Sequence, residues 1–171
     1  QRAGWAGGRV RQEGGAGGVR AAAVAGVGGE STADAVEASR QAGELGIAGG
    51  GRFPEVDSQL KGAVGTEGTS PDGLVPETIR AIKAAVPEIG VITDVALDCY
   101  TDHGHDGIVE DGRIINDGSL ERLAEQAFIH AHAGADVVAP SDMMDGRVQA
   151  IREALEANGY QEGMIRAYAA K

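Results

Sequence analysis

The sequence predicts an α/β fold in which short parallel strands alternate with helices. Three short apolar runs predict buried strands, at residues 90–98, 135–140 and 164–168. Segments with helical periodicity precede the first run and separate the others. Parallel strands are buried on both faces and need crossover connections, usually helices, so this alternation is typical of βαβ units. The 171 residues suit one domain, or part of a larger one.

The first part of the chain, residues 1–31, is expected to be a glycine-rich, loosely ordered N-terminal arm. Fifteen of the 28 glycines lie in the first 51 residues, where the single aromatic residue is Trp5. Such a sequence buries too little apolar surface to offset the loss of chain entropy on folding. The folded domain is therefore expected to cover residues 32–171.

Four segments place apolar residues at helical spacing and are predicted to be helices: residues 32–42, 73–86, 119–134 and 147–157. Ser31 or Thr32 can cap the first helix through its side-chain oxygen. Pro87 stops the second helix, and Gly134 closes the third.

The composition argues against nucleic acid or a membrane as a partner. The formal net charge is −11, and only three residues are lysines, whereas phosphate binding draws on clustered Lys and Arg. No apolar run approaches the roughly 20 residues that span a bilayer, and the first residues lack the apolar core of a signal peptide. The single cysteine, Cys99, excludes an internal disulfide and a zinc site made of cysteines alone. We therefore expect a soluble, cytoplasmic protein.

Polar residues follow three of the predicted strands, at the edge where barrels and doubly wound sheets place their sites. The candidate residues after the three strands are, in order, Asp94, Asp98, Asp102, His103, His105 and Asp106; then Ser141, Asp142 and Asp145; then Lys171. The convergence of three polar strand ends is the functional signal.

The acidic and histidine residues of the first group also have structural interpretations. The His103 and His105 segment can cap turns, or it can offer imidazole and Asp oxygens to magnesium or zinc. Asp94 lies inside an apolar run, where a carboxylate is either satisfied structurally or functional. His130 and His132 are two residues apart on a helix and cannot share a face, so they are not expected to bind one metal.

The two adjacent methionines and the last lysine are also considered as site candidates. Met143 and Met144 are expected to pack in the core. A lysine at the end of a chain, such as Lys171, is usually solvated. A lysine that follows a buried strand can instead be desolvated, which makes its amine nucleophilic.

Several motifs resemble the porphobilinogen synthase (5-aminolevulinic acid dehydratase) family. They are HGHDG at residues 103–107, PSDMMDGR at residues 140–147 and YAAK at residues 168–171, within a resemblance that runs from Phe53 to Lys171. The resemblance implies the first half of a (β/α)8 TIM barrel with an N-terminal arm. It also implies a lyase that condenses two 5-aminolevulinate molecules into porphobilinogen, in tetrapyrrole and heme biosynthesis.

The family's active-site residues can be placed on this sequence. The family activates its two substrates through two lysines that form Schiff bases, and Lys171 falls on the first of these. The resemblance implies that Asp94 positions or deprotonates reacting groups and that Ser141 hydrogen-bonds substrate. Asp106 is a further substrate-binding candidate.

The resemblance also bears on the metal and on assembly. Zinc-dependent members bind the metal with three cysteines, whose positions here hold Ala96, Asp98 and Asp106. The resemblance therefore implies magnesium or a monovalent cation, with Asp98 and Asp106 as ligands, in place of active-site zinc. It further implies a homo-octamer, in the cytoplasm or, in a photosynthetic eukaryote, the plastid.

Two hypotheses of different class remain open. A whole barrel takes about 250 residues, and the family's second lysine lies beyond position 171. Residues 49–52 are also Gly-Gly-Gly-Arg where the family has an apolar strand. The chain is then either part of a porphobilinogen synthase or a non-catalytic half-barrel that binds a metal or a partner. A lysine-dependent aldolase-like barrel keeps the imine chemistry but gives no reason for PSDMMDGR.

Overall fold

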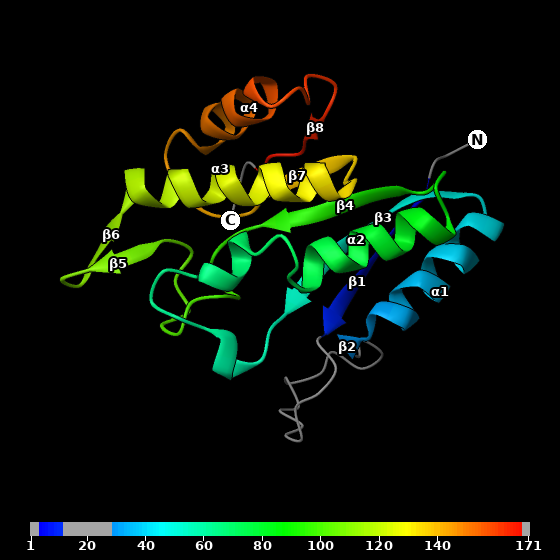
Figure 1. Ribbon diagram of the computed structural model, residues 1–171, viewed down its shortest axis with the longest axis horizontal. Helices are drawn as coiled ribbons and strands as arrows, with labels where there is room; N and C mark the ends of the chain where they lie inside the picture. Colours follow the sequence, from blue (N-terminus) through cyan, green and yellow to red (C-terminus); the bar gives the residue numbers. More distant parts are fainter. Residues whose placement is uncertain (1–3, 12–28, 169–171) are drawn as a thin grey trace.

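The computed structural model describes residues 4–11 and 29–168, which contain two sheets and four α-helices (Figure 1). The large sheet has six strands in the order β2-β1-β3-β4-β7-β8. These strands are β1 (Gly4–Arg11), β2 (Gly29–Glu30), β3 (Ile47–Glu55), β4 (Gly90–Val95), β7 (Val137–Pro140) and β8 (Met164–Ile165). The helices are α1 (Thr32–Glu44), α2 (Leu74–Ala85), α3 (Asn116–Ala133) and α4 (Arg147–Ala157). Two short 3₁₀ helices, η1 (Ser58–Leu60) and η2 (Thr66–Thr69), lie between β3 and α2.

The strand order identifies an arc of a (β/α) barrel. All neighbouring strands of the large sheet are parallel. Apart from β2 at the edge, they follow one another in chain order with one helix between each pair. Successive helices also pack against each other (Figure 1). A doubly wound sheet would reverse its strand order at a switch point. The expected α/β fold, a partial TIM barrel, is confirmed.

Part of the N-terminal arm expected over residues 1–31 lies within the described residues. Residues 4–11 form β1 and residues 29–30 form β2, whereas residues 1–3 and 12–28 lie outside the described part. β1 pairs with β3, and residue 7 lies opposite residue 51. Backbone N–H and C=O groups make this pairing, so glycine-rich segments can form it without side chains to bury. The domain boundary at residue 32 stays a prediction.

The four helices form where the apolar spacing predicts them. Ser31 caps α1: its Oγ accepts the Asp34 N–H (3.1 Å), and its own N–H donates to the Asp34 carboxylate (3.1 Å). This reciprocal pair is a capping box. α2 ends before Pro87, and α3 ends at Gly134, whose φ of 112° favours glycine.

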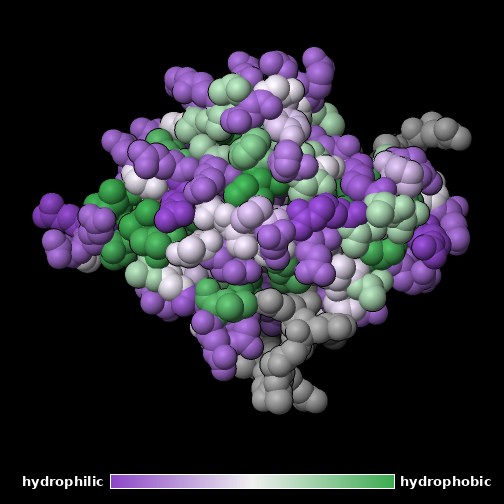
Figure 2. All heavy atoms as spheres, viewed as in Figure 1, coloured by the Kyte–Doolittle hydropathy of each residue, from purple (hydrophilic) through white to green (hydrophobic). Residues whose placement is uncertain are grey.

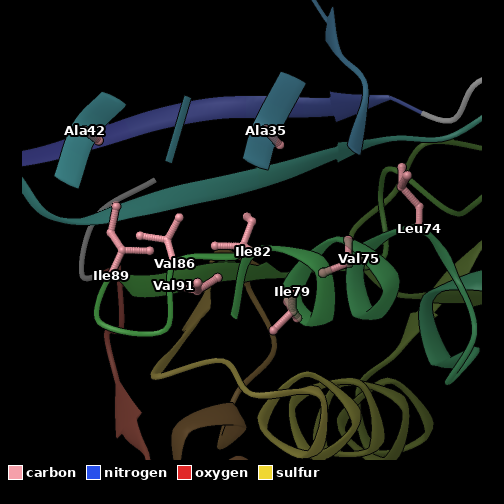
Figure 3. Packing of buried hydrophobic residues seen from close by; sticks show 9 residues of the cluster. All are labelled: Ala35, Ala42, Leu74, Val75, Ile79, Ile82, Val86, Ile89 and Val91. Carbon is pink, nitrogen blue, oxygen red and sulfur yellow. The ribbon is translucent and has the colours of Figure 1, made fainter. Parts of the chain in front are cut away.

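Two apolar clusters hold the helices against the sheet. The first joins α1 and α2 to the start of β4 (Figure 3), and its members are Ala35, Ala42, Leu74, Val75, Ile79, Ile82, Val86, Ile89 and Val91. The second joins α3 and α4 to the ends of β4 and β7, and its members are Val95, Leu97, Leu123, Ala127, Ala131, Val138, Met144, Ile151 and Leu155. A third, smaller cluster contains Ile92, Val137 and Ala139, with Tyr168 packed against it. Because strand side chains alternate, this third cluster marks the opposite face of the sheet.

A short antiparallel hairpin, β5 (Ile108–Glu110) with β6 (Arg113–Ile115), follows the HGHDG segment and was missed by the sequence prediction. Its two turn residues, Asp111 and Gly112, both have positive φ (49° and 74°), as in a type I′ turn. Figure 2 shows hydrophobic side chains at the surface where this hairpin lies, and Ile114 is 44% exposed. Within the described residues, no helix has the length and apolar character needed to cross a membrane.

Candidate functional site

Asp94 and Ser141 lie at neighbouring strand ends. In the parallel pairing of β4 with β7, Asp94 is opposite Ala139 and Val95 is opposite Pro140. The Ser141 N–H then donates to the Val95 carbonyl oxygen (3.1 Å). The structure thus brings together the strand ends that carry these two predicted site residues. Their chemical roles stay predictions.

The position of Asp94 in β4 directs its side chain away from α3. The preceding residue, Thr93, contacts His130 of α3, and the following residue, Val95, packs in the cluster with α3. Side chains alternate along a strand, so Asp94 shares the other face with Ile92, near Tyr168. In a barrel arc this is the inner face, where substrates bind at the carboxyl ends of the strands.

Two side chains in the segment just after β4, those of Cys99 and Tyr100, have raised pKa values. Burial raises the pKa of the Cys99 thiol, and the negative charges of Asp98 and Asp94 raise it further. Burial also raises the pKa of the Tyr100 hydroxyl. A thiol must lose its proton to act as a nucleophile or metal ligand. Cys99 is therefore a neutral packing residue at physiological pH.

The HGHDG segment is held by a local hydrogen bond and by a contact to a distant part of the chain. His103 Nε2 lies 3.2 Å from the Ala63 carbonyl oxygen, and the His105 N–H donates to His103 Nδ1 (3.2 Å). In the part of the chain that the structure describes, no group of three His, Cys, Asp or Glu side chains is placed to hold a metal ion. The expected ligands Asp98 and Asp106, one exposed and one partly buried, therefore do not complete a metal site with other described residues.

Gly107 lies where the HGHDG segment packs closely against the β5–β6 hairpin and α3. A Cβ at Gly107 would lie 2.8 Å from Ile114 Cγ2 and 2.9 Å from Ser119 Oγ. Ser119 cannot move freely, since its hydroxyl accepts the Ile108 N–H (2.9 Å) and donates to the Ile115 carbonyl (2.6 Å). The motif needs glycine at this position because the two segments approach so closely.

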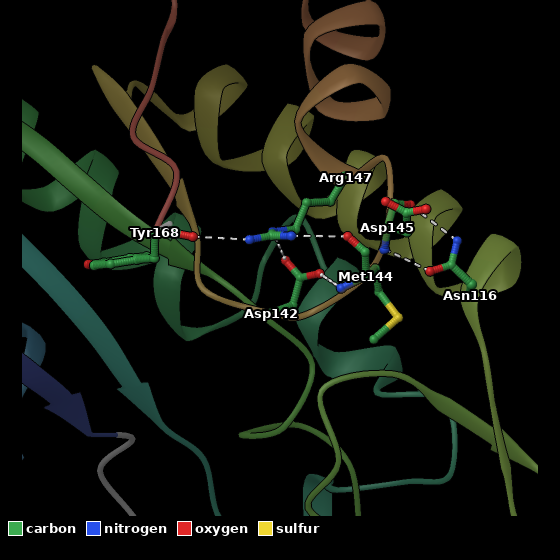
Figure 4. A network of polar contacts seen from close by, with 6 residues as sticks. All are labelled: Asn116, Asp142, Met144, Asp145, Arg147 and Tyr168. Atoms are coloured by element: carbon green, nitrogen blue, oxygen red, sulfur yellow. Dashed lines mark hydrogen bonds and ion pairs between the residues drawn. The ribbon is translucent and has the colours of Figure 1, made fainter. Parts of the chain in front are cut away.

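The PSDMMDGR loop after β7 contains a buried carboxylate that is held by an arginine (Figure 4). Asp142 Oδ2 accepts the Met144 N–H (2.7 Å), and Asp142 Oδ1 lies 3.5 Å from Arg147 Nε. Burial raises the pKa of Asp142, whereas the Met144 N–H and the Arg147 charge lower it. The expectation that Met143 and Met144 both pack in the core is wrong for Met143, which is 60% exposed. The turn held by Asp142 points only Met144 inward.

The same loop is attached to the start of α3. Asn116 Oδ1 accepts the Asp145 N–H (2.8 Å), and its amide nitrogen donates to the Asp145 carbonyl (3.2 Å; Figure 4). The loop that carries Ser141 is therefore held by Arg147 of α4 and by Asn116 of α3.

Two polar residues on the buried face of α3 were missed as partners of the site. His130 is fully buried, its Nδ1 lies 3.0 Å from Thr93 Oγ1, and burial lowers its pKa to about 3. Gln126, four residues earlier, donates to the Ala96 carbonyl (3.3 Å). Polar residues four apart on an apolar helix face were the signal in the sequence. As expected, His132 does not share this face, because it is exposed and contacts the Tyr160 hydroxyl (2.9 Å).

The third predicted site residue, Lys171, lies outside the described residues. The strand that precedes it is described: β8 pairs with β7, and the Arg166 N–H donates to the Val138 carbonyl (3.0 Å). β8 is shorter than the expected strand over residues 164–168. Three neighbouring strands thus end at one edge of the sheet, in the order β4, β7, β8.

Comparisons with known proteins agree on one family. A model of the family "delta-aminolevulinic acid dehydratase" matches residues 15–171. The delta-aminolevulinic acid dehydratase of Bradyrhizobium diazoefficiens is 53% identical over 119 residues, which are 70% of this chain and 34% of that protein. The chloroplastic delta-aminolevulinic acid dehydratase of Physcomitrium patens is 56% identical over 120 residues, 70% of this chain and 28% of that protein.

A solved structure extends the similarity to the fold. The crystal structure of delta-aminolevulinic acid dehydratase (porphobilinogen synthase) from Toxoplasma gondii, in complex with the reaction product porphobilinogen, matches with a TM-score of 0.90 and 40% identity. The match covers 98% of this chain and 47% of that one. The chain spans about a third of the length of the two curated relatives described above.

Proposed function

Because this chain belongs to the delta-aminolevulinic acid dehydratase family, we propose that the protein containing it is a porphobilinogen synthase. The intact protein, meaning these 171 residues with any sequence that precedes or follows them, condenses two 5-aminolevulinate molecules into porphobilinogen with loss of water. The observation that carries this proposal is the family match over residues 15–171, which includes all three polar strand ends.

Lys171 supplies the reactive amine in this proposal. The neutral amine adds to the ketone carbon of 5-aminolevulinate, and one water leaves as the imine forms. Protonation of the imine nitrogen makes it an electron sink, which stabilises the negative charge left on the neighbouring carbon when a base removes its proton. That carbon then uses the same electron pair to form the bond to the second substrate. The strand that precedes Lys171 in the sequence, β8, pairs with β7, and this supports the assignment.

The acidic and hydroxyl side chains bind substrate and move protons. Asp94 accepts or returns a proton at the carbon next to the imine, as a carboxylate on the inner face of the arc can do. Ser141, one strand away, donates a hydrogen bond to the bound substrate. Asp106 contributes a second carboxylate near the loop of Ser141, since its charge acts on Asp142.

A metal ion is generally involved in this family. We propose magnesium or a monovalent cation in preference to zinc, because the cysteine positions of the zinc-dependent members hold Ala96, Asp98 and Asp106. The described residues do not by themselves form a complete site for such an ion.

The remaining features follow from the same family membership. The substrate is a small molecule, and we propose a homo-octameric assembly. We place the protein in the cytoplasm, or in the plastid if its source is a photosynthetic eukaryote, as in the chloroplastic relatives. The alternative, a non-catalytic half-barrel that binds a metal or a partner, is less well supported, because the matched relatives carry the enzyme's name.

Porphobilinogen formation by the intact protein tests this proposal. We expect the wild type to convert 5-aminolevulinate, and Asp94→Asn to lower kcat by about 100-fold or more, the usual contribution of a general base. Asp72→Asn is the matched control, since Asp72 is 95% exposed and pairs with Arg80 at the surface. Full activity of Asp94→Asn would remove Asp94 from the mechanism. A wild type that binds the substrate without converting it would favour the half-barrel.

A further inference from the structure

Arg147, the last residue of the PSDMMDGR motif, connects the loop after β7 to the chain after β8. One of its terminal nitrogens donates to the Met144 carbonyl (3.1 Å), and the other donates to the Tyr168 carbonyl (3.1 Å; Figure 4). Tyr168 lies 21 residues further along the chain and three residues before Lys171. A single planar guanidinium thus joins the loop that begins with Ser141 to the segment that leads to the reactive lysine.

Asp142 orients this guanidinium. The Asp142 side chain has no exposed surface, and its Oδ1 lies 3.5 Å from Arg147 Nε. Its other oxygen accepts the Met144 N–H (2.7 Å), so the carboxylate cannot rotate without breaking a buried contact. The side chain of Arg147 is itself only 21% exposed, which protects the contacts from solvent.

We propose that Arg147 is a positioning residue: oriented by Asp142, it fixes the main chain at Tyr168 relative to the Ser141 loop and thereby sets the reach of Lys171 toward substrate. The inference rests on the proposed function, because it assigns a consequence to imine formation at Lys171. Lysine cannot replace arginine here, since an ammonium lacks the planar fork that contacts two carbonyls and a carboxylate together.

Arg152 offers a matched control on the same helix. It also donates to two main-chain carbonyls of the segment after α4, those of Gln161 (3.2 Å) and Gly163 (2.7 Å). Both carbonyls precede β8, whereas the Tyr168 carbonyl follows it. Loss of either arginine therefore removes comparable contacts between α4 and the following segment, but of the two side chains only that of Arg147 contacts the chain after β8.

The test measures imine formation in the intact protein. Borohydride reduces the imine that Lys171 forms with 5-aminolevulinate, and the yield against time and substrate concentration separates the rate of imine formation from substrate affinity. We expect Arg147→Lys to lower this rate and kcat by about 100-fold, as a displacement of about 1 Å does, with KM changed by less than about threefold. Arg152→Lys should leave the rate of imine formation and kcat unchanged. Its urea unfolding midpoint should be similar to that of Arg147→Lys.

Two results would overturn the inference. Unchanged imine formation in Arg147→Lys, or an equal loss in Arg152→Lys, would show that the two arginines only attach the segment to α4. If Arg147→Lys does not fold, Asp142→Asn decides in the same assay, because it keeps the shape of the side chain while removing the charge that orients Arg147. A wild type that forms no reducible imine refutes the proposed function, and the role of Arg147 with it. If the wild type forms the imine and all the variants form it equally well, only the positioning role is refuted.

Discussion

His130 Nδ1 lies 3.0 Å from Thr93 Oγ1, and both side chains are fully buried between α3 and β4. Thr93 is the residue before Asp94, and the Ala96 carbonyl two residues after Asp94 accepts a hydrogen bond from Gln126. Two polar residues on one face of α3 therefore hold β4 on both sides of Asp94. Together, these two contacts fix the backbone from which the Asp94 carboxylate projects.

Replacing His130 should reduce the loss of stability in acid. Burial lowers the pKa of His130 to about 3 in the folded protein, against about 6.5 in the unfolded chain. The unfolded state alone takes up this proton between those values, so the stabilisation is complete above about pH 6.5 and declines as the pH falls toward 3. By pH 5 this residue should account for a loss of about 2 kcal/mol.

Urea unfolding of the intact protein at pH 7 and pH 5 measures this effect. In His130→Gln, the difference in unfolding free energy between pH 7 and pH 5 should be smaller than in the wild type by about 2 kcal/mol. His132→Gln is the control, because His132 is exposed on the same helix, and it should behave as the wild type does. An equal acid loss in wild type and His130→Gln would show that other groups cause it.

Gly107→Ala should destabilise the protein by about 1–3 kcal/mol, the usual cost of overpacking. The added Cβ would lie 2.8 Å from Ile114 and 2.9 Å from the Ser119 hydroxyl, which holds two backbone contacts. Gly62→Ala serves as the control, since a Cβ there meets nothing within 4 Å. Thermal unfolding of both variants checks the prediction, and equal midpoints would contradict the close approach at Gly107.

The four helices and the strands β4, β7 and β8 were predictable because each has an apolar pattern of its own. Residues 147–157, for example, form α4 over the predicted range. β1 and β3 were not predictable in the same way, because both are rich in glycine and their pairing is made by backbone groups. The hairpin β5–β6 did have a local signal, the Asp111-Gly112 turn between two short β-branched segments, which sequence reasoning did not use.

The site was predictable as far as strand ends alone define it. Asp94 and Ser141 could be placed together because parallel strands end at one edge of a sheet. The contacts that support them could not, because they join residues far apart: His130 with Thr93, 37 residues away, and Arg147 with Tyr168, 21 residues away. Such contacts depend on how the helices pack on the sheet, and the sequence pattern does not encode this packing locally.

Catalysis by the intact protein should survive removal of zinc. Ala96, Asp98 and Asp106 stand where zinc-dependent members have cysteines, and carboxylate oxygens favour hard cations. Porphobilinogen formation should therefore persist with a zinc-selective chelator and should increase with magnesium or potassium. Activity that is lost on chelation and restored by zinc alone would contradict this assignment.

The central claim is that Lys171 forms the imine from which porphobilinogen is made. An ordinary lysine, with a pKa near about 10.4, is almost wholly protonated at neutral pH, so a reactive amine requires an environment that lowers this value. The most direct measurement is peptide mass spectrometry of the intact protein after borohydride reduction with 5-aminolevulinate. We predict an adduct on Lys171 that is absent, together with nearly all turnover, in a folded Lys171→Met variant. The absence of an adduct on Lys171, or full activity of Lys171→Met, would contradict the account.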